Sequence, residues 1–231
     1  TAKHGGDFLI ANDPWFRPID CFQGPDGSVY VVDWYDKRAA HLDPVDNWDK
    51  TNGRIYKVEY VGKGNGEPSG VSRRVKEFDL SKKTSAELVE LLKHPNKWWR
   101  NEARRMLAEK GAGKEVVEKL KKSVMEEKGV PALEALWALN AISALDVLTW
   151  RDLLRHTDDY VRAWTIRLTP ENAMVLRSDS LYSQFAGYVS AETSPIVLAQ
   201  LAATAKCLGS RNGFLLSRDL WLREDTPSDP I

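Results

Sequence analysis

The spacing of the hydrophobic residues changes near residue 80, and this change limits the folds that the chain can adopt. In residues 8–61, short apolar runs and alternating apolar and polar residues indicate β-strands. From Leu80 onward, apolar residues recur every three or four positions, as on one face of a helix. The sequence therefore predicts an α+β protein, in which a short antiparallel β segment precedes a helical part.

The β segment carries signals for several short strands separated by turns. Pro25-Asp26-Gly27 and Asn52-Gly53 are turn sequences. The expected strands are residues 8–11, 19–23, 29–32 and 54–61. Four such strands suit one blade of a β-propeller. A very small sheet is hardly stable by itself, so this blade-like segment is expected to need neighbouring sheets.

The helical part repeats a unit of two short helices. Equivalent places in successive units are occupied by Arg100, Ala132, Arg162 and Leu198, at intervals of 32, 30 and 36 residues. A repeat of this length is typical of an α-solenoid. About four HEAT-like helix pairs are expected, each stacking on the next because one pair cannot bury its apolar face alone.

Composition shifts divide the chain into segments. Residues 1–62 form the β segment, the Gly-rich stretch 63–79 is a linker, and residues 80–208 form the helical repeats. After residue 208 the helical pattern weakens, so residues 209–231 are predicted to be a loop that leads to a missing continuation. The chain is expected to be an internal piece of a longer protein.

Charge and cysteine content narrow the function classes. Lys+Arg and Asp+Glu number 33 each, which lacks the basic excess of a nucleic-acid binder. No stretch approaches the ~20 apolar residues that span a bilayer, so no membrane span is expected. Cys21 and Cys207 lack metal-ligand spacing. They are interpreted as two small buried hydrophobic residues, with a disulfide as the alternative.

Four stretches of the β segment carry a family resemblance. They are residues 11–18 (ANDPWFRP), 24–27 (GPDG), 30–36 (YVVDWYD) and 53–56 (GRIY). Together they resemble the last propeller blade of the large "membrane-bound dehydrogenase" proteins of planctomycetes and Verrucomicrobia. Those proteins combine a propeller similar to glucose/sorbosone dehydrogenases, HEAT-like repeats and a cytochrome c module. Residues 91–107 and 135–139 are similar to that family's repeats.

The resemblance implies a function for the parent protein. The parent would be a quinone-dependent sugar or alcohol dehydrogenase-like oxidoreductase, periplasmic or exported. Its propeller could bind pyrroloquinoline quinone (PQQ) and calcium, and haem would belong to a module outside this chain. The partners would be the remaining blades and the C-terminal module, and this piece alone is expected to be inactive. The alternative is a non-catalytic scaffold whose HEAT-like repeats bind a protein partner.

Candidate site residues lie in the β segment. In the related dehydrogenases, arginines near the propeller axis contact PQQ, so Arg17 is a candidate cofactor-binding residue, together with Tyr35. A guanidinium suits the carboxylates of PQQ, although Arg17 could instead form a structural ion pair. Asp33 and His41 could act as a base on a sugar hydroxyl. They could equally hydrogen-bond their loop. No metal site is predicted.

Two further patterns of charged residues occur in the sequence. Asp43, Asp46 and Asp49 suggest calcium, but their spacing of three differs from that of an EF-hand loop, which favours a solvated turn over an irregular calcium site. Arg100 and Arg162 begin the second helices of their pairs. Each is expected to have a structural role, paired with an aspartate of a neighbouring repeat such as residue 158 or 159.

Overall fold

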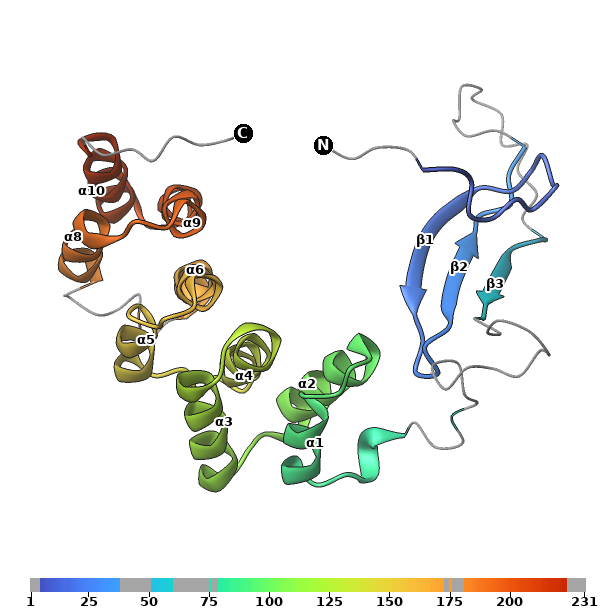
Figure 1. Cartoon of the computed structure of the whole chain (residues 1–231), viewed down its shortest axis with the longest axis horizontal. Helices are drawn as coiled ribbons and strands as arrows, with labels where there is room; N and C mark the ends of the chain where they lie inside the picture. The colour runs from blue at the N-terminus through green and yellow to red at the C-terminus, as the bar shows by residue number, and fades with distance from the viewer. Residues whose placement is uncertain are drawn as a thin grey trace. The chain divides into compact units, whose positions relative to one another are not determined.

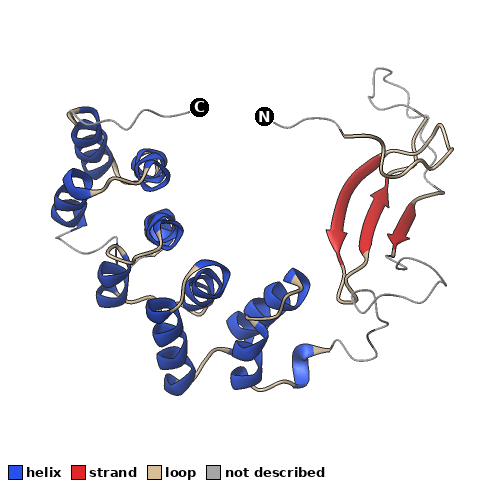
Figure 2. Ribbon diagram, viewed as in Figure 1, coloured by secondary structure: helices blue, strands red, loops and turns tan. Residues whose placement is uncertain are grey.

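The computed structural model describes residues 5–37, 51–59, 75, 79–172, 175 and 181–223. The chain divides into two compact units (Figure 1). The sheet unit comprises residues 1–78 with 96–98, and the helical unit comprises residues 79–95 and 99–231. Strands occur in the first unit and helices in the second, as Figure 2 shows, so the chain is an α+β protein as predicted.

The sheet unit is a three-stranded antiparallel sheet of order β1-β2-β3, formed by Pro18–Gln23, Val29–Asp33 and Arg54–Val58. The turn between β1 and β2 is closed by the N–H of Gly24, which donates to the carbonyl of Ser28 at 2.8 Å. The expected fourth strand, residues 8–11, is extended chain in which Phe8 is 88% exposed. The described residues offer it no strand with which to pair.

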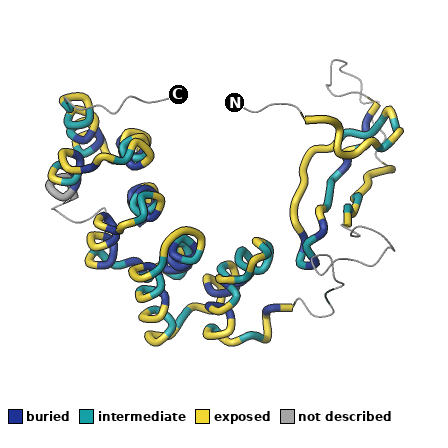
Figure 3. Tube along the Cα trace, in the orientation of Figure 1, coloured by how far each residue is buried: buried dark blue, intermediate teal, exposed yellow. Residues whose placement is uncertain are grey.

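Both faces of the sheet carry apolar side chains. Cys21, Val31 and Tyr56 lie opposite one another across the three strands, and so share a face. Phe22 and Tyr30 share the other face, where their rings stack at 5.5 Å. Every residue of β1 is nevertheless exposed, as the yellow tube of Figure 3 shows. The two apolar faces of the sheet therefore remain largely uncovered.

The helical unit begins with a 3₁₀ turn at Leu80–Lys82. Its helices are α1 (Ser85–Leu91), α2 (Lys97–Lys110), α3 (Lys114–Glu126), α4 (Gly129–Ala141), α5 (Val147–Leu153), α6 (Asp159–Leu168), α8 (Leu181–Ala191), α9 (Pro195–Ala205) and α10 (Ser210–Trp221), with a second 3₁₀ turn at Thr169–Glu171. A capping box forms the start of α1. The N–H of Glu87 donates to Thr84 Oγ1, and the N–H of Thr84 donates to the Glu87 carboxylate at 2.8 Å.

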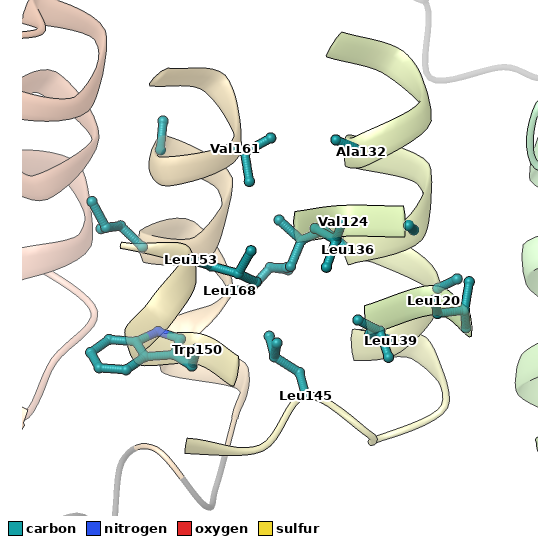
Figure 4. Packing of buried hydrophobic residues seen from close by; sticks show 14 of the residues in the cluster. Leu120, Val124, Ala132, Leu136, Leu139, Leu145, Trp150, Leu153, Val161 and Leu168 are labelled. Carbon is teal, nitrogen blue, oxygen red and sulfur yellow. The ribbon is translucent and has the colours of Figure 1, made fainter. Parts of the chain in front are cut away.

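The helices of this unit lie in two rows (Figure 1). Helices α2, α4, α6 and α9 follow one side, and α1, α3, α5 and α8 the other. Helix α4 packs on α3 and α6, and α9 packs on α6 and α10. Leucines from α3, α4 and α5 contribute to the hydrophobic core of this unit (Figure 4). Every buried hydrophobic residue in the described ranges belongs to this unit, from Leu80 to Leu216.

Two further sequence expectations were wrong. Residues 209–231 were predicted to be a loop, yet α10 occupies Ser210–Trp221. Gly213 and Leu216, one turn apart, bury against the unit, and a Cβ at Gly213 would collide with the carbonyl oxygen of Ala205. The absence of a side chain at Gly213 permits close helix packing. Because this buried position holds a glycine and not a large apolar residue, the helical pattern is weak in the sequence. Cys21 and Cys207 are both free and exposed, neither buried nor bridged.

No helix within the described ranges combines the length and apolar character that crossing a bilayer requires. Of the predicted linker 63–79, only residues 75 and 79 are described.

Candidate functional site

Asp33 lies at the end of β2 and organises the loops around it. Its Oδ1 accepts the N–H of Arg17 at 2.7 Å and the N–H of Tyr35 at 2.9 Å. The residue is 2% exposed, and its other oxygen, Oδ2, is buried without a hydrogen-bond partner. Three of the four predicted site residues are therefore brought together. The fourth, His41, lies outside the described residues, as do Asp43, Asp46 and Asp49.

The Arg17 guanidinium binds backbone carbonyls. Nη1 donates to Pro14 and Phe16, at 2.9 and 2.8 Å, and Nη2 donates to Lys37 at 3.1 Å. Nε is buried and has no partner. A bidentate contact with a carboxylate needs two adjacent N–H groups that are both free and accessible, and Arg17 offers no such pair. Arg17 in this arrangement does not fit the carboxylates of PQQ. The alternative role predicted for Arg17, a structural ion pair, is also not what the structure shows, because the guanidinium contacts carbonyls and not an acid.

Tyr35 is held by packing. Its backbone has a positive φ of 55°, which is uncommon for a residue with a side chain. Its ring lies 5.6 Å from that of Trp15, and the Arg54 guanidinium sits 4.1 Å from the ring centroid. Arg54 also donates to Asp13 at 2.6 Å. These contacts tie the loop after β2 to β3 and to the residues before β1, and they engage the ring proposed to contact a cofactor.

A second candidate site lies in the helical unit, where one local arrangement occurs twice. Arg100 donates through Nη1 to the carbonyl of His94 at 2.7 Å, and Arg162 does the same to His156 at 2.8 Å. The residue two places after each histidine caps the following helix. Each arginine is thus fixed by the turn that precedes its own helix, and its remaining N–H groups point to another repeat.

Both arginines pair with buried glutamates of the next helix pair. Arg100 Nε lies 3.1 Å from Glu134, which Arg104 also contacts at 2.5 Å. Arg162 donates to both oxygens of Glu192 at 2.9 Å. The expected structural pairing across repeats is present, but the expected aspartate partners were wrong.

The two aspartates have other roles. Asp158 accepts the N–H of Gly129, at the start of α4, at 2.7 Å. Asp159 accepts the hydroxyl of Ser194 at 2.9 Å. Both aspartates thus accept hydrogen bonds from other groups, and glutamates pair with the guanidiniums.

A cavity of about 650 Å³ opens beside the Arg162–Glu192 pair. It lies between α5, the start of α6 and the end of α8. The polar side chains that line it include Arg151, Arg155, His156 and Tyr188. The Tyr188 hydroxyl donates to Glu192. The cavity is thus walled by an ion-paired network on one side and by the two arginines of the α5 end on another.

Electrostatics fix the protonation of this network. Burial raises the pKa of Glu192, but hydrogen bonds from Arg162, Tyr188 and the Ser194 N–H outweigh it and lower this pKa to about 2. Burial and the neighbouring carboxylate raise the pKa of Tyr188. His156 Nδ1 accepts the Asp158 N–H at 3.0 Å, which leaves Nε2 as the ring nitrogen that can donate. Glu192 stays ionised and Tyr188 stays protonated near neutral pH.

This cavity was not predicted from the sequence, in which Arg162 stood out but Arg151, Arg155, Tyr188 and Glu192 did not. One signal was available, because each arginine of the repeated turn has a glutamate 34 or 30 residues further on, close to the repeat length. No group of histidine, cysteine, aspartate and glutamate side chains that could hold a metal occurs in the part of the chain that the structure describes.

Comparison with known proteins gives one finding. Residues 1–62 match the family described as a domain of unknown function (DUF7133). The matched range contains the three strands and ends where the sequence analysis placed the end of the β segment. No curated protein and no solved structure matches the chain.

Proposed function

We propose that the helical unit is an α-solenoid of HEAT-like helix pairs and that it serves as a protein-interaction scaffold. The observation that carries this proposal is a row of exposed apolar side chains at equivalent places. Val130, Tyr160 and Ile196 are each the second residue of the second helix of a pair, and they are 51%, 54% and 39% exposed. We call these three residues the apolar row.

Burial and periodicity support the scaffold function together. A large apolar side chain that is half exposed once in a protein needs no explanation. Three at the same place in successive pairs share one edge of the stack, because the pairs repeat. The arginine–glutamate pairs between repeats hold these pairs in a fixed relation. A partner that contacts several repeats would therefore meet a preformed surface.

Photo-crosslinking tests the scaffold function. Benzoylphenylalanine is placed at position 160 in the apolar row, and at position 148 as the matched control. Leu148 is 63% exposed and is the second residue of α5, the first helix of its pair. In an extract of the producing organism, we expect one discrete adduct from position 160. Unlabelled protein should compete for it, and a Val130→Ser/Tyr160→Ser/Ile196→Ser variant should not.

An equal yield of adduct from position 148 would contradict the scaffold function. So would equal competition for the position 160 adduct by the unlabelled triple variant and the unlabelled wild type. Circular dichroism of the triple variant provides the folding control, since substitutions of exposed residues leave helix content unchanged.

The sheet unit supports a second candidate function. We propose that it is the last blade of the propeller of a quinone-dependent dehydrogenase-like parent, exported to the periplasm. Apolar side chains on both sheet faces favour a sheet stacked between neighbours. The buried, unpartnered Oδ2 of Asp33 favours a site at the end of β2. Because Arg17 does not fit PQQ, no catalytic step through the quinone is derived.

Asp33→Asn tests the second function in the parent protein. The amide keeps an acceptor for the N–H groups of Arg17 and Tyr35 and removes the charge. We expect sugar-dependent dye reduction by the parent protein to fall at least tenfold, as for loss of a general base. Asp20→Asn on exposed β1 is the control. Unchanged activity in Asp33→Asn would remove this candidate.

A further inference from the structure

The cavity between α5 and α8 carries an excess of positive charge. Three arginines line it, and Glu192 is the acid among its described lining residues. Arg162 and Glu192 neutralise each other through two hydrogen bonds of 2.9 Å. The excess therefore comes from Arg151 and Arg155.

These two arginines are available to a ligand. The Arg155 guanidinium is exposed and has no partner in the described part of the chain. The Arg151 side chain is 49% exposed, and its neighbour Asp152 reaches it only at 4.0 Å, the limit for an ion pair. A guanidinium matches a carboxylate in shape and charge, and two of them four residues apart can hold two acidic groups.

The rest of the wall supplies a hydrogen-bond donor and room for a ligand. His156 Nε2 can donate, because Nδ1 accepts a backbone N–H. Gly187 of α8 faces open space, since a Cβ there would meet nothing within 4 Å. A volume of about 650 Å³ accommodates several side chains.

We propose that this cavity binds the carboxylates of an acidic segment of the scaffold's protein partner. The inference rests on the proposed scaffold function, because it names the chemistry of the partner that the scaffold holds. Charge complementarity selects an acidic peptide. A nucleic acid would need an extended basic surface, whereas the chain carries zero net charge and the cavity offers two uncompensated arginines.

Fluorescence anisotropy with a fluorescein-labelled hexaglutamate peptide tests the proposal on the full chain. We expect saturable binding that weakens as salt rises and is absent for hexaglutamine. Arg155→Gln and Arg151→Gln should each raise Kd about tenfold, the loss of one charge-assisted hydrogen bond. Gly187→Leu should abolish binding by filling the cavity, although it changes no charge. Arg105→Gln, on an exposed and internally paired arginine of α2, should leave Kd unchanged.

Three outcomes would overturn the proposal. One is equal binding to Gly187→Leu, which would place the peptide elsewhere. Another is an Arg105→Gln loss as large as that of Arg155→Gln, which would indicate non-specific attraction. The third is binding of inorganic phosphate, followed by intrinsic fluorescence, without binding of the peptide, which would make the cavity a small-anion site. Crosslinking from position 160 would survive all three, so failure here leaves the scaffold function standing.

Discussion

The two units of this chain bury opposite kinds of residue. In the sheet unit, the buried side chains among the described residues are polar: Asp26, Ser28, Asp33 and Asp36. In the helical unit, leucines and other apolar residues from Leu80 to Leu216 form one continuous cluster. Hydrogen bonds fix the loops of the sheet, but burial of apolar area is what drives folding. The helical unit therefore contains its own source of stability, and the sheet unit lacks one.

The largest expected effect is a difference in folding between the two units when each is expressed alone. Residues 79–223 expressed alone should show helical circular dichroism and a cooperative thermal transition. Residues 1–62 alone should show no such transition, because three short strands without a covered face do not bury enough apolar surface. Cooperative unfolding of the 1–62 fragment would break the comparison, since it would show that loop hydrogen bonds suffice.

The next effect concerns the ion pairs of the helical unit. Glu134→Ala should lower the free energy of unfolding by about 3 kcal/mol, because it leaves the partly buried guanidiniums of Arg100 and Arg104 without their buried acid. Urea unfolding followed at 222 nm measures this. Glu102→Ala is the control, because its partner Arg105 is exposed, and no detectable change is expected. Equal losses in the two variants would show that burial of the pair does not matter.

These contacts also show what sequence can and cannot predict here. The change of period is local, so the helical unit could be predicted from the sequence. The Thr84–Glu87 capping box is also a local feature. The partner of Arg100 is 34 residues away in the sequence. To predict that this partner is Glu134, one would need to know which face of α4 is turned towards α2. Buried glutamates on a helix face look like surface residues in a sequence. The positions of the arginines were therefore predictable, and their partners were not.

The predicted site failed for a related reason. Asp33 and Arg17 do meet, as neighbours at a strand end can, but through the backbone N–H of Arg17 and not through its guanidinium. A sequence motif shows that an arginine is present at position 17. It does not show that the carbonyls of Pro14 and Lys37 already accept hydrogen bonds from the guanidinium. The cavity between α5 and α8 joins residues from three helices and has no contiguous signature at all.

A smaller, pH-dependent effect distinguishes the Arg162–Glu192 pair. The pKa of Glu192 falls from 4.5 to about 2 on folding, so the ionised form is favoured in the folded state. Its contribution to stability is fully present above pH 4.5 and is lost as pH falls towards 2. We expect the urea midpoint of the wild type to drop more steeply over this range than that of Glu192→Gln. Parallel curves for the two proteins would contradict an ionised, paired Glu192.

The smallest expected effect sharpens the comparison most. Ile55 of β3 is 68% exposed, so Ile55→Ser should change the stability of this chain by less than about 0.5 kcal/mol. In a protein whose neighbouring blade covers this face, the same substitution should cost about 1–3 kcal/mol, the value of burying one aliphatic side chain. Hydrogen exchange of the β3 amides measures both cases. A large loss in this chain alone would mean that the face is already covered, and a null result in the longer protein would mean that no blade stacks there. A sheet that is covered by a neighbouring blade predicts both results together: Ile55→Ser leaves the stability of this chain unchanged and lowers the stability of the protein that contains the neighbouring blade.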